Sequence, residues 1–138
     1  GSKGVTRKRF GYGGEDAYFC EGPNQHGCVG LGVSDGVYMW RLQGIDAGEF
    51  SKQLMQLCAE SVRSGETNAL QVLKAAHLRM RQDRVKGSAT VCLAVIDTTT
   101  GLLNCANLGD SGFLIMRRDP STLEWSMVYK SPQQEHHF

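Results

Sequence analysis

Two helix patterns follow one another within residues 46–83, and strand patterns lie on both sides of them. In the first, over residues 46–64, Asp46 is a good N-cap, and Glu49 three residues later completes a capping-box-like pattern. Its apolar residues recur at helical spacing: Phe50, Leu54, Leu57, Cys58 and Val62. The second runs from about residue 68 to 83, with an apolar stripe of Leu70, Leu73, Ala76 or His77, and Met80. Segregated helices and strands indicate an α+β fold with antiparallel sheet and the helices on one face.

The strand patterns predict short strands before the helices and a meander of hairpins after them. Residues 1–14 are glycine-rich and basic and are expected to be loop-like. The early strands are expected over residues 17–20 and 28–34, and in the latter glycine alternates with larger apolar residues, which indicates close packing on the glycine side. After the helices, turn sequences separate four more strand patterns, over residues 89–97, 102–108, 113–117 and 125–129.

Composition narrows the class of protein. The 138 residues suit a single globular domain, and a net charge of +1 from 15 basic and 14 acidic residues argues against a general nucleic-acid-binding surface. No apolar stretch approaches the length of a membrane span. Five cysteines, an odd number without a CxxC pair and mostly within apolar runs, predict buried free thiols in a reducing, intracellular compartment. Gly1-Ser2 is typical of a cleaved tag, so we expect a scar and basic tail over 1–10 and the domain over 11–138.

Acidic residues fall at the ends of several predicted strands. Glu15 and Asp16 precede the first strand, Asp35 follows the second, and Asp110 lies between two hairpin strands. Such carboxylates can converge at one rim of a sheet, where they would suit Mg²⁺ or Mn²⁺, and Gly36 would let its carbonyl approach a metal. Asp-Gly and Gly-Asp-Ser-Gly are also common turn sequences, so the spacing alone leaves both interpretations open.

Four stretches carry a family resemblance: GGEDAYF (13–19), GVSDGVYMW (32–40), GSATVCLAVID (87–97) and ANLGDSGFLIMR (106–117). In their order and with the helices between them, they resemble the metal-dependent serine/threonine protein phosphatases of type 2C. The likeness is greatest to a eukaryotic branch that includes a mitochondrial matrix phosphatase. It covers residues 11–138 and implies part of a four-layer α-β-β-α sandwich with antiparallel sheets, two Mg²⁺ or Mn²⁺ ions and phosphoprotein substrates.

The resemblance also implies roles for individual residues. Asp35 matches the aspartate that bridges both metals, Gly36 the residue that offers its carbonyl, and Asp110 an aspartate associated with a further metal. Glu15 and Asp16 match an acidic pair that binds metal directly or through water. A metal-bridging hydroxide would attack phosphoserine or phosphothreonine without a phospho-enzyme.

Three further residues are candidates for other steps. His136 is a candidate proton donor, with a surface histidine as the alternative. Arg9 is a candidate for binding phosphate, because the family often places an arginine shortly before the acidic pair. Arg41, just after the Asp-Gly motif, is a second candidate.

The sequence departs from the family in two respects. The chain covers the first half of the family's domain, so we expect a fragment that lacks later metal ligands, has little activity and can self-associate through exposed edges. Val37 stands where many relatives have histidine, and Tyr38 and Met39 replace a glycine pair, where they could crowd the site or block the turn. The alternative function is therefore a pseudophosphatase that acts as a binding or regulatory module. A location in the mitochondrial matrix is an expectation from the resemblance alone.

Overall fold

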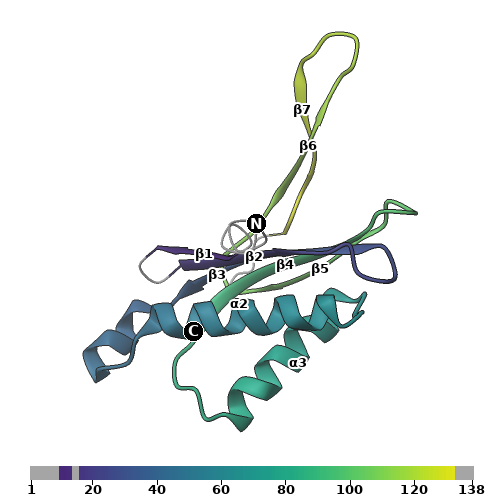
Figure 1. Ribbon diagram of the computed structural model, residues 1–138. Coiled ribbons are helices and arrows are strands. Elements are labelled where there is room, and N and C mark those ends of the chain that lie inside the picture. The colour runs from purple at the N-terminus through teal and green to yellow at the C-terminus, as the bar shows by residue number, and fades with distance from the viewer. Residues whose placement is uncertain (1–9, 14–15, 133–138) are drawn as a thin grey trace, which may run out of the picture.

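A five-stranded antiparallel sheet forms the centre of the molecule (Figure 1). The computed structural model describes residues 10–13 and 16–132. The strands lie in the order in which they occur in the chain: β1 (Phe10–Gly13), β2 (Asp16–Glu21), β3 (Cys28–Gly36), β4 (Ala89–Asp97) and β5 (Leu103–Leu108). All helices of the described chain fall between β3 and β4, so the α+β expectation is confirmed.

Helices α2 (Ala47–Arg63) and α3 (Ala69–Gln82) cover one face of this sheet (Figure 1). The Asp46 carboxylate caps α2 by accepting hydrogen bonds from the backbone N–H groups of Gly48 (2.9 Å) and Glu49 (3.2 Å). The Glu49 carboxylate accepts a hydrogen bond from Gln53, one turn further on (3.2 Å). Both predicted helices therefore begin within one residue of the expected position. Neither is long and apolar enough to cross a membrane, and the same holds for every helix in the described ranges.

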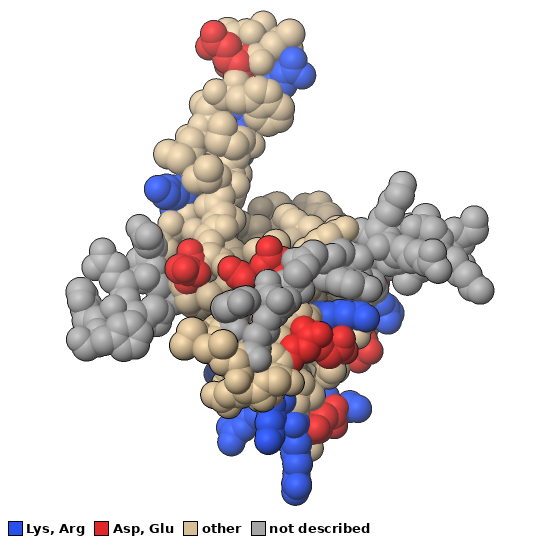
Figure 2. Space-filling view, turned by 90° about the vertical axis from the view of Figure 1, so that its left-hand side faces the viewer, with Lys and Arg blue, Asp and Glu red and all other residues tan. Residues whose placement is uncertain are grey.

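A second, two-stranded sheet stands away from the first on the side opposite the helices (Figure 1). It is the hairpin of β6 (Leu114–Arg118) and β7 (Trp125–Lys130). Its shaft carries few charged atoms, which gather instead at its tip and base (Figure 2). Large apolar side chains along the hairpin are about half exposed, namely Leu114, Met116, Trp125, Met127, Val128 and Tyr129. The chain thus crosses from one sheet to the other between β5 and β6.

The core lies between the five-stranded sheet and the two helices. Phe19 on β2 is 1% exposed, and its ring covers two glycines of the neighbouring strand. A Cβ atom on Gly32 would lie 2.5 Å from this ring, and one on Gly30 would lie 2.6 Å from Val62 of α2. The alternating glycines of β3 therefore make room for an aromatic ring and a helix. The close packing expected on the glycine side is confirmed, and the structure identifies what packs there.

Three local expectations need correction. Residues Phe10–Gly13 form β1 rather than loop, because their backbone pairs with β2 from Phe10↔Phe19 to Gly13↔Asp16. The buried face of α3 consists of Ala69, Val72, Ala76 and Met80, whereas the expected core residue Leu70 is 47% exposed. The helix therefore packs on α2 and the sheet through the row of residues next to the predicted apolar stripe. A 3₁₀ helix, η1 (Tyr38–Gln43), follows β3 where no helix was expected.

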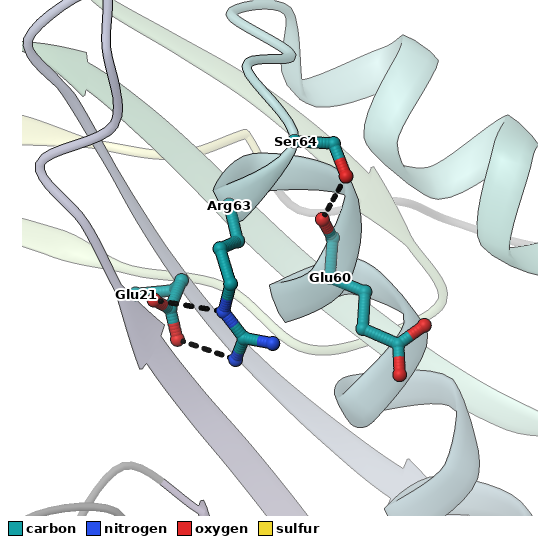
Figure 3. Close-up of polar contacts among 4 residues, drawn as sticks. All are labelled: Glu21, Glu60, Arg63 and Ser64. Atoms are coloured by element: carbon teal, nitrogen blue, oxygen red, sulfur yellow. Dashed lines mark hydrogen bonds and ion pairs between the residues drawn. The ribbon is translucent and has the colours of Figure 1, made fainter.

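A buried carboxylate ties the end of β2 to the end of α2. The side chain of Glu21 is 6% exposed and that of Arg63 is 54% exposed. Arg63 donates from Nε to Oε1 of Glu21 (3.4 Å) and from Nη2 to Oε2 (3.1 Å), and this pairing raises the pKa of Arg63 (Figure 3). The carboxylate of Glu60, on the same helix, points away from the pair (Figure 3). The two-pronged geometry fixes the direction of the last turn of α2 against the sheet.

Replacing Glu21 with glutamine should lower the free energy of unfolding by about 1–2 kcal/mol, because a buried charge-assisted pair becomes a mismatched amide. Urea unfolding followed by circular dichroism measures this change. Glu60→Gln, at an exposed position one turn earlier, serves as the control and should shift stability by less than about 0.5 kcal/mol. Equal effects of the two variants would contradict a stabilising role for the pair.

Candidate functional site

Two predicted site residues, Asp16 and Asp35, lie directly opposite one another in the sheet. Asp16 begins β2, and the antiparallel register pairs it with Asp35 of β3. Both are exposed, whereas their chain neighbours Ala17 and Ser34 are buried beneath the sheet. Directly opposed side chains have Cβ atoms about 4.5–5.5 Å apart. The fold therefore brings two carboxylates from separate strands to one place on the face away from the helices, as the strand-end argument predicts.

Like charges at directly opposed positions destabilise a sheet unless a cation neutralises them. The two carboxylates offer hard oxygen donors, the kind that Mg²⁺ and Mn²⁺ prefer, so this pair fits those ions. Acidic atoms gather where the hairpin meets the body of the molecule (Figure 2). Within residues 10–13 and 16–132, however, no three His, Cys, Asp or Glu side chains lie close enough to hold a metal together.

Asp16→Asn should raise the free energy of unfolding of the metal-free protein by about 0.2–1 kcal/mol, because it removes one of two opposed charges. Thermal or urea unfolding in EDTA measures the change. Asp83→Asn, which breaks the exposed Arg79–Asp83 ion pair (3.1 Å), provides a contrast and should leave stability unchanged or slightly lower. A loss of stability in Asp16→Asn would show that the opposed charges are not a strain on the sheet.

Gly36 lies at the end of β3 and is buried against the start of α2. A Cβ atom on this residue would lie 2.5 Å from the carbonyl oxygen of Ala47. The first turn of α2 can thus approach the strand only because residue 36 has no side chain. This packing explains why residue 36 is a glycine without reference to a metal. That the Gly36 carbonyl binds a metal stays a prediction.

Asp110 is exposed in the turn that joins β5 to β6. The residues on either side of it contact Thr90 of β4: Ser111 through a 2.9 Å hydroxyl–hydroxyl hydrogen bond, and Gly109 through close packing. Thr90 in turn lies opposite Asp35 in the sheet register. The structure therefore links Asp110 to the Asp16–Asp35 pair through Thr90, a residue that the sequence analysis missed. Its only signal was a polar residue near the start of an otherwise apolar strand.

The backbone after Gly36 and Val37 turns into helix η1 (Tyr38–Gln43). The backbone N–H of Val37 donates to the carbonyl of Ser88 (3.0 Å), and the N–H of Trp40 donates to the carbonyl of Val37 (3.3 Å). The indole N–H of Trp40 also donates to the Ser88 hydroxyl (2.7 Å). Met39 points into solvent and is 65% exposed. Helix η1 is thereby attached to the residue before β4, and whether Val37, Tyr38 and Met39 crowd the site stays a prediction.

Four predicted residues lie outside what the structure describes. Arg9, Glu15 and His136 are not among the described residues, and Arg41 lies in η1 with a side chain that is not described. The predicted roles of all four stay predictions.

The cysteines of the described chain are free, as the sequence predicts. Cys28, Cys58 and Cys92 are buried as expected, but Cys20 and Cys105 are exposed, so the expectation of burial is wrong for these two. Cys20 lies on the face of β2 that alternates with the buried residues Phe19 and Glu21. Burial raises the pKa of the Cys58 thiol to about 12, so that thiol stays protonated at physiological pH. None of these thiols lies in a group of three side chains able to hold a metal.

The sequence of the chain is similar to those of several protein phosphatases. No family model matches the chain. It is 39% identical over 142 residues to the protein phosphatase PTC7 homolog of Xenopus laevis and 37% identical over 141 residues to the human one, with 99% of this chain covered in each case. It is also 38% identical over 129 residues to the probable protein phosphatase 2C 55 of Arabidopsis thaliana. The chain is a homologue of the type 2C protein phosphatases.

A solved structure supports the same relationship. The X-ray structure of the photosystem II phosphatase PBCP matches 99% of this chain with a TM-score of 0.69 and 30% sequence identity. This confirms the expected partial type 2C architecture, with helices on one sheet and a second sheet begun by the hairpin. The chain spans 44% of the Xenopus homologue, 43% of the human homologue and 47% of the PBCP chain.

Proposed function

We propose that this chain supplies part of the metal site of a phosphatase that hydrolyses phosphoserine and phosphothreonine on proteins with the help of two Mg²⁺ or Mn²⁺ ions. One observation carries the proposal: Asp16 and Asp35 are exposed and directly opposed on a chain homologous to type 2C phosphatases. Two directly opposed carboxylates attract a cation, and their oxygens are the ligands that Mg²⁺ and Mn²⁺ prefer.

Within this function, each residue has a defined task. Asp16 and Asp35 would hold the cations on the outer face of the sheet, Asp110 would contribute from the turn before the hairpin, and Glu15 and the Gly36 carbonyl would complete this chain's ligands. Bound there, the ions would activate a water molecule and neutralise phosphate oxygens. The rigid sheet keeps Asp16 and Asp35 in register, so the ligands need little reorganisation when the ions bind.

A binding or regulatory module without catalysis is the second candidate. It is favoured by the absence, within the described ranges, of any group of three side chains able to hold a metal. In this alternative, the exposed apolar residues on the outer face of the sheet, such as Tyr18, Leu31 and Val33, contact a partner.

Hydrolysis of p-nitrophenyl phosphate and of a phosphothreonine peptide by the complete product of the gene separates these candidates. The phosphatase requires turnover that depends on Mn²⁺ and is lost in EDTA. The module predicts no turnover and no saturable Mn²⁺ binding in calorimetry, and that combination would refute the phosphatase proposal.

The compartment also belongs to the proposal. We place the protein inside the cell, in a reducing environment, because its cysteines in the described chain are unpaired. The mitochondrial matrix is the compartment suggested by the resemblance.

A further inference from the structure

Thr90 stands between the two parts of the candidate site. On the outer face of the sheet, the register places Asp16, Asp35 and Thr90 in one row across β2, β3 and β4. Asp35 and Thr90 are directly opposed, so their side chains are neighbours on that face. The last pair between β4 and β5 on this side is Val91↔Leu108. One step beyond that pair, Gly109 comes opposite Thr90 and extends the same row.

Both branches of the Thr90 side chain contact the turn that carries Asp110. Its hydroxyl Oγ1 lies 2.9 Å from the Ser111 hydroxyl, in a partly buried hydrogen bond. Its methyl group packs on Gly109, where an added Cβ atom would lie only 2.6 Å from Thr90 Cγ2. Gly109 also has a φ of +99°, a conformation that favours glycine. The turn is therefore held on Thr90 at the residue before Asp110 and at the residue after it.

This attachment lies where the chain leaves one sheet for the other. β5 belongs to the five-stranded sheet and β6 to the hairpin, and the five-residue segment between them includes Asp110. A polypeptide segment between two sheets can change direction about its own torsions unless side chains tie it down. In the described chain, Thr90 provides a tie to the strand that adjoins Asp35.

We propose that Thr90 is a positioning residue that fixes Asp110 relative to the Asp16–Asp35 pair. This inference rests on the proposed metal-dependent function and adds to it a residue that is not itself a ligand. The hydroxyl is the essential part, because it forms the hydrogen bond to Ser111, while the methyl group only limits how closely Gly109 can approach. Serine at position 90 should therefore retain the function, and valine should lose it.

The test is NMR of the ¹⁵N-labelled 138-residue chain, first without metal and then with substoichiometric Mn²⁺, which broadens the signals of nearby amides. In the unmodified chain, we expect ordered amides at Asp110 and Ser111, and Mn²⁺ broadening at Asp16, Asp35 and Asp110. In Thr90→Val, the order parameters at Asp110 and Ser111 should fall from about 0.85 towards 0.6. Broadening at Asp110 should decrease several-fold, while that at Asp16 and Asp35 persists.

Three further variants separate positioning from a general loss of structure. Thr90→Ser should restore the original pattern, and Ser111→Ala should reproduce the effect of Thr90→Val. The double variant Thr90→Val/Ser111→Ala should show no larger effect than either single variant, because both substitutions remove the same hydrogen bond. Thr98→Val is the matched control. The Thr98 hydroxyl donates a hydrogen bond to the carbonyl of Gly27 (2.7 Å), and Thr98 lies just beyond the end of β4 that is far from Asp110.

Each outcome bears on a different claim. Unchanged order parameters and unchanged broadening at Asp110 in Thr90→Val would overturn the positioning role and leave the proposed function standing. Absence of broadening at Asp16 and Asp35 in the unmodified chain would instead count against the proposed metal site. A pattern in Thr90→Ser like that of Thr90→Val would overturn the role given to the hydroxyl.

Discussion

Asp35→Ala should reduce kcat/KM for Mn²⁺-dependent phosphate hydrolysis by the complete gene product on the order of a thousandfold, equivalent to about 4 kcal/mol of transition-state stabilisation. The residue is exposed, lies directly opposite Asp16 and adjoins Thr90, so its carboxylate is central to the row that would hold the cations. Removing it leaves Asp16 without the opposed carboxylate. A steady-state assay with p-nitrophenyl phosphate at saturating Mn²⁺ measures the loss.

Asp83→Ala is the matched control for this prediction. Asp83 is exposed directly after α3 and pairs with Arg79 of that helix, away from the candidate site, so turnover should stay within about twofold. Circular dichroism of Asp35→Ala should show an unchanged fold, and thermal unfolding should show no loss of stability, because the side chain is on the surface and its removal relieves the opposed charge. Undiminished turnover in a folded Asp35→Ala protein would remove Asp35 from the proposed site.

Phe19→Ala should lower the free energy of unfolding by about 3–5 kcal/mol, which is a large part of the stability of a domain of this size. The ring is 1% exposed and lies over Gly30 and Gly32, neither of which has a side chain that could move into the vacated space. The cavity would therefore persist, and the cost should lie towards the upper end of that range. Urea unfolding followed by circular dichroism measures it.

Gly32→Ala offers a complementary test of the same packing. Alone, it should destabilise by about 1–3 kcal/mol, because the new methyl group would lie 2.5 Å from the ring of Phe19. Combined with Phe19→Ala, the methyl group occupies part of the cavity, so the double variant should be at least about 1 kcal/mol more stable than additivity predicts. Val33→Ala, at a 48%-exposed position on the other face of β3, should cost less than about 1 kcal/mol. Strict additivity would contradict the proposed ring-over-glycine packing.

The elements that depend on local interactions were predictable. Asp46 and Asn68 cap α2 and α3 as their side-chain chemistry requires, and the near-continuous apolar run forms β4 over the expected residues, Ala89–Asp97. The misjudged elements depend on distant partners. β1 forms because β2 provides hydrogen-bonding groups, and the buried stripe of α3 is set by its contacts with α2 and the sheet.

The candidate site divides in the same way. The residue types, acidic side chains at strand ends beside glycine, are visible in the sequence and carry the family resemblance. Pattern alone could not choose between a turn and a ligand for Asp35, because the chemistry of Asp-Gly suits both. Thr90 was missed because its importance comes from its neighbours across the sheet and in the turn, and these are far from it in sequence.

By itself, the sequence determined α2 and α3, the strands from β2 to β7 and the acidic residues available at strand ends, since capping, periodicity and turn chemistry act over a few residues. Only the tertiary structure decided that Asp16 faces Asp35, that Gly36 makes room for α2, and that Thr90 holds the turn of Asp110. A shift of one residue in strand register would turn each of these side chains to the opposite face. The register depends on the burial of Phe19 over the glycines of β3, a contact between strands that no local pattern encodes.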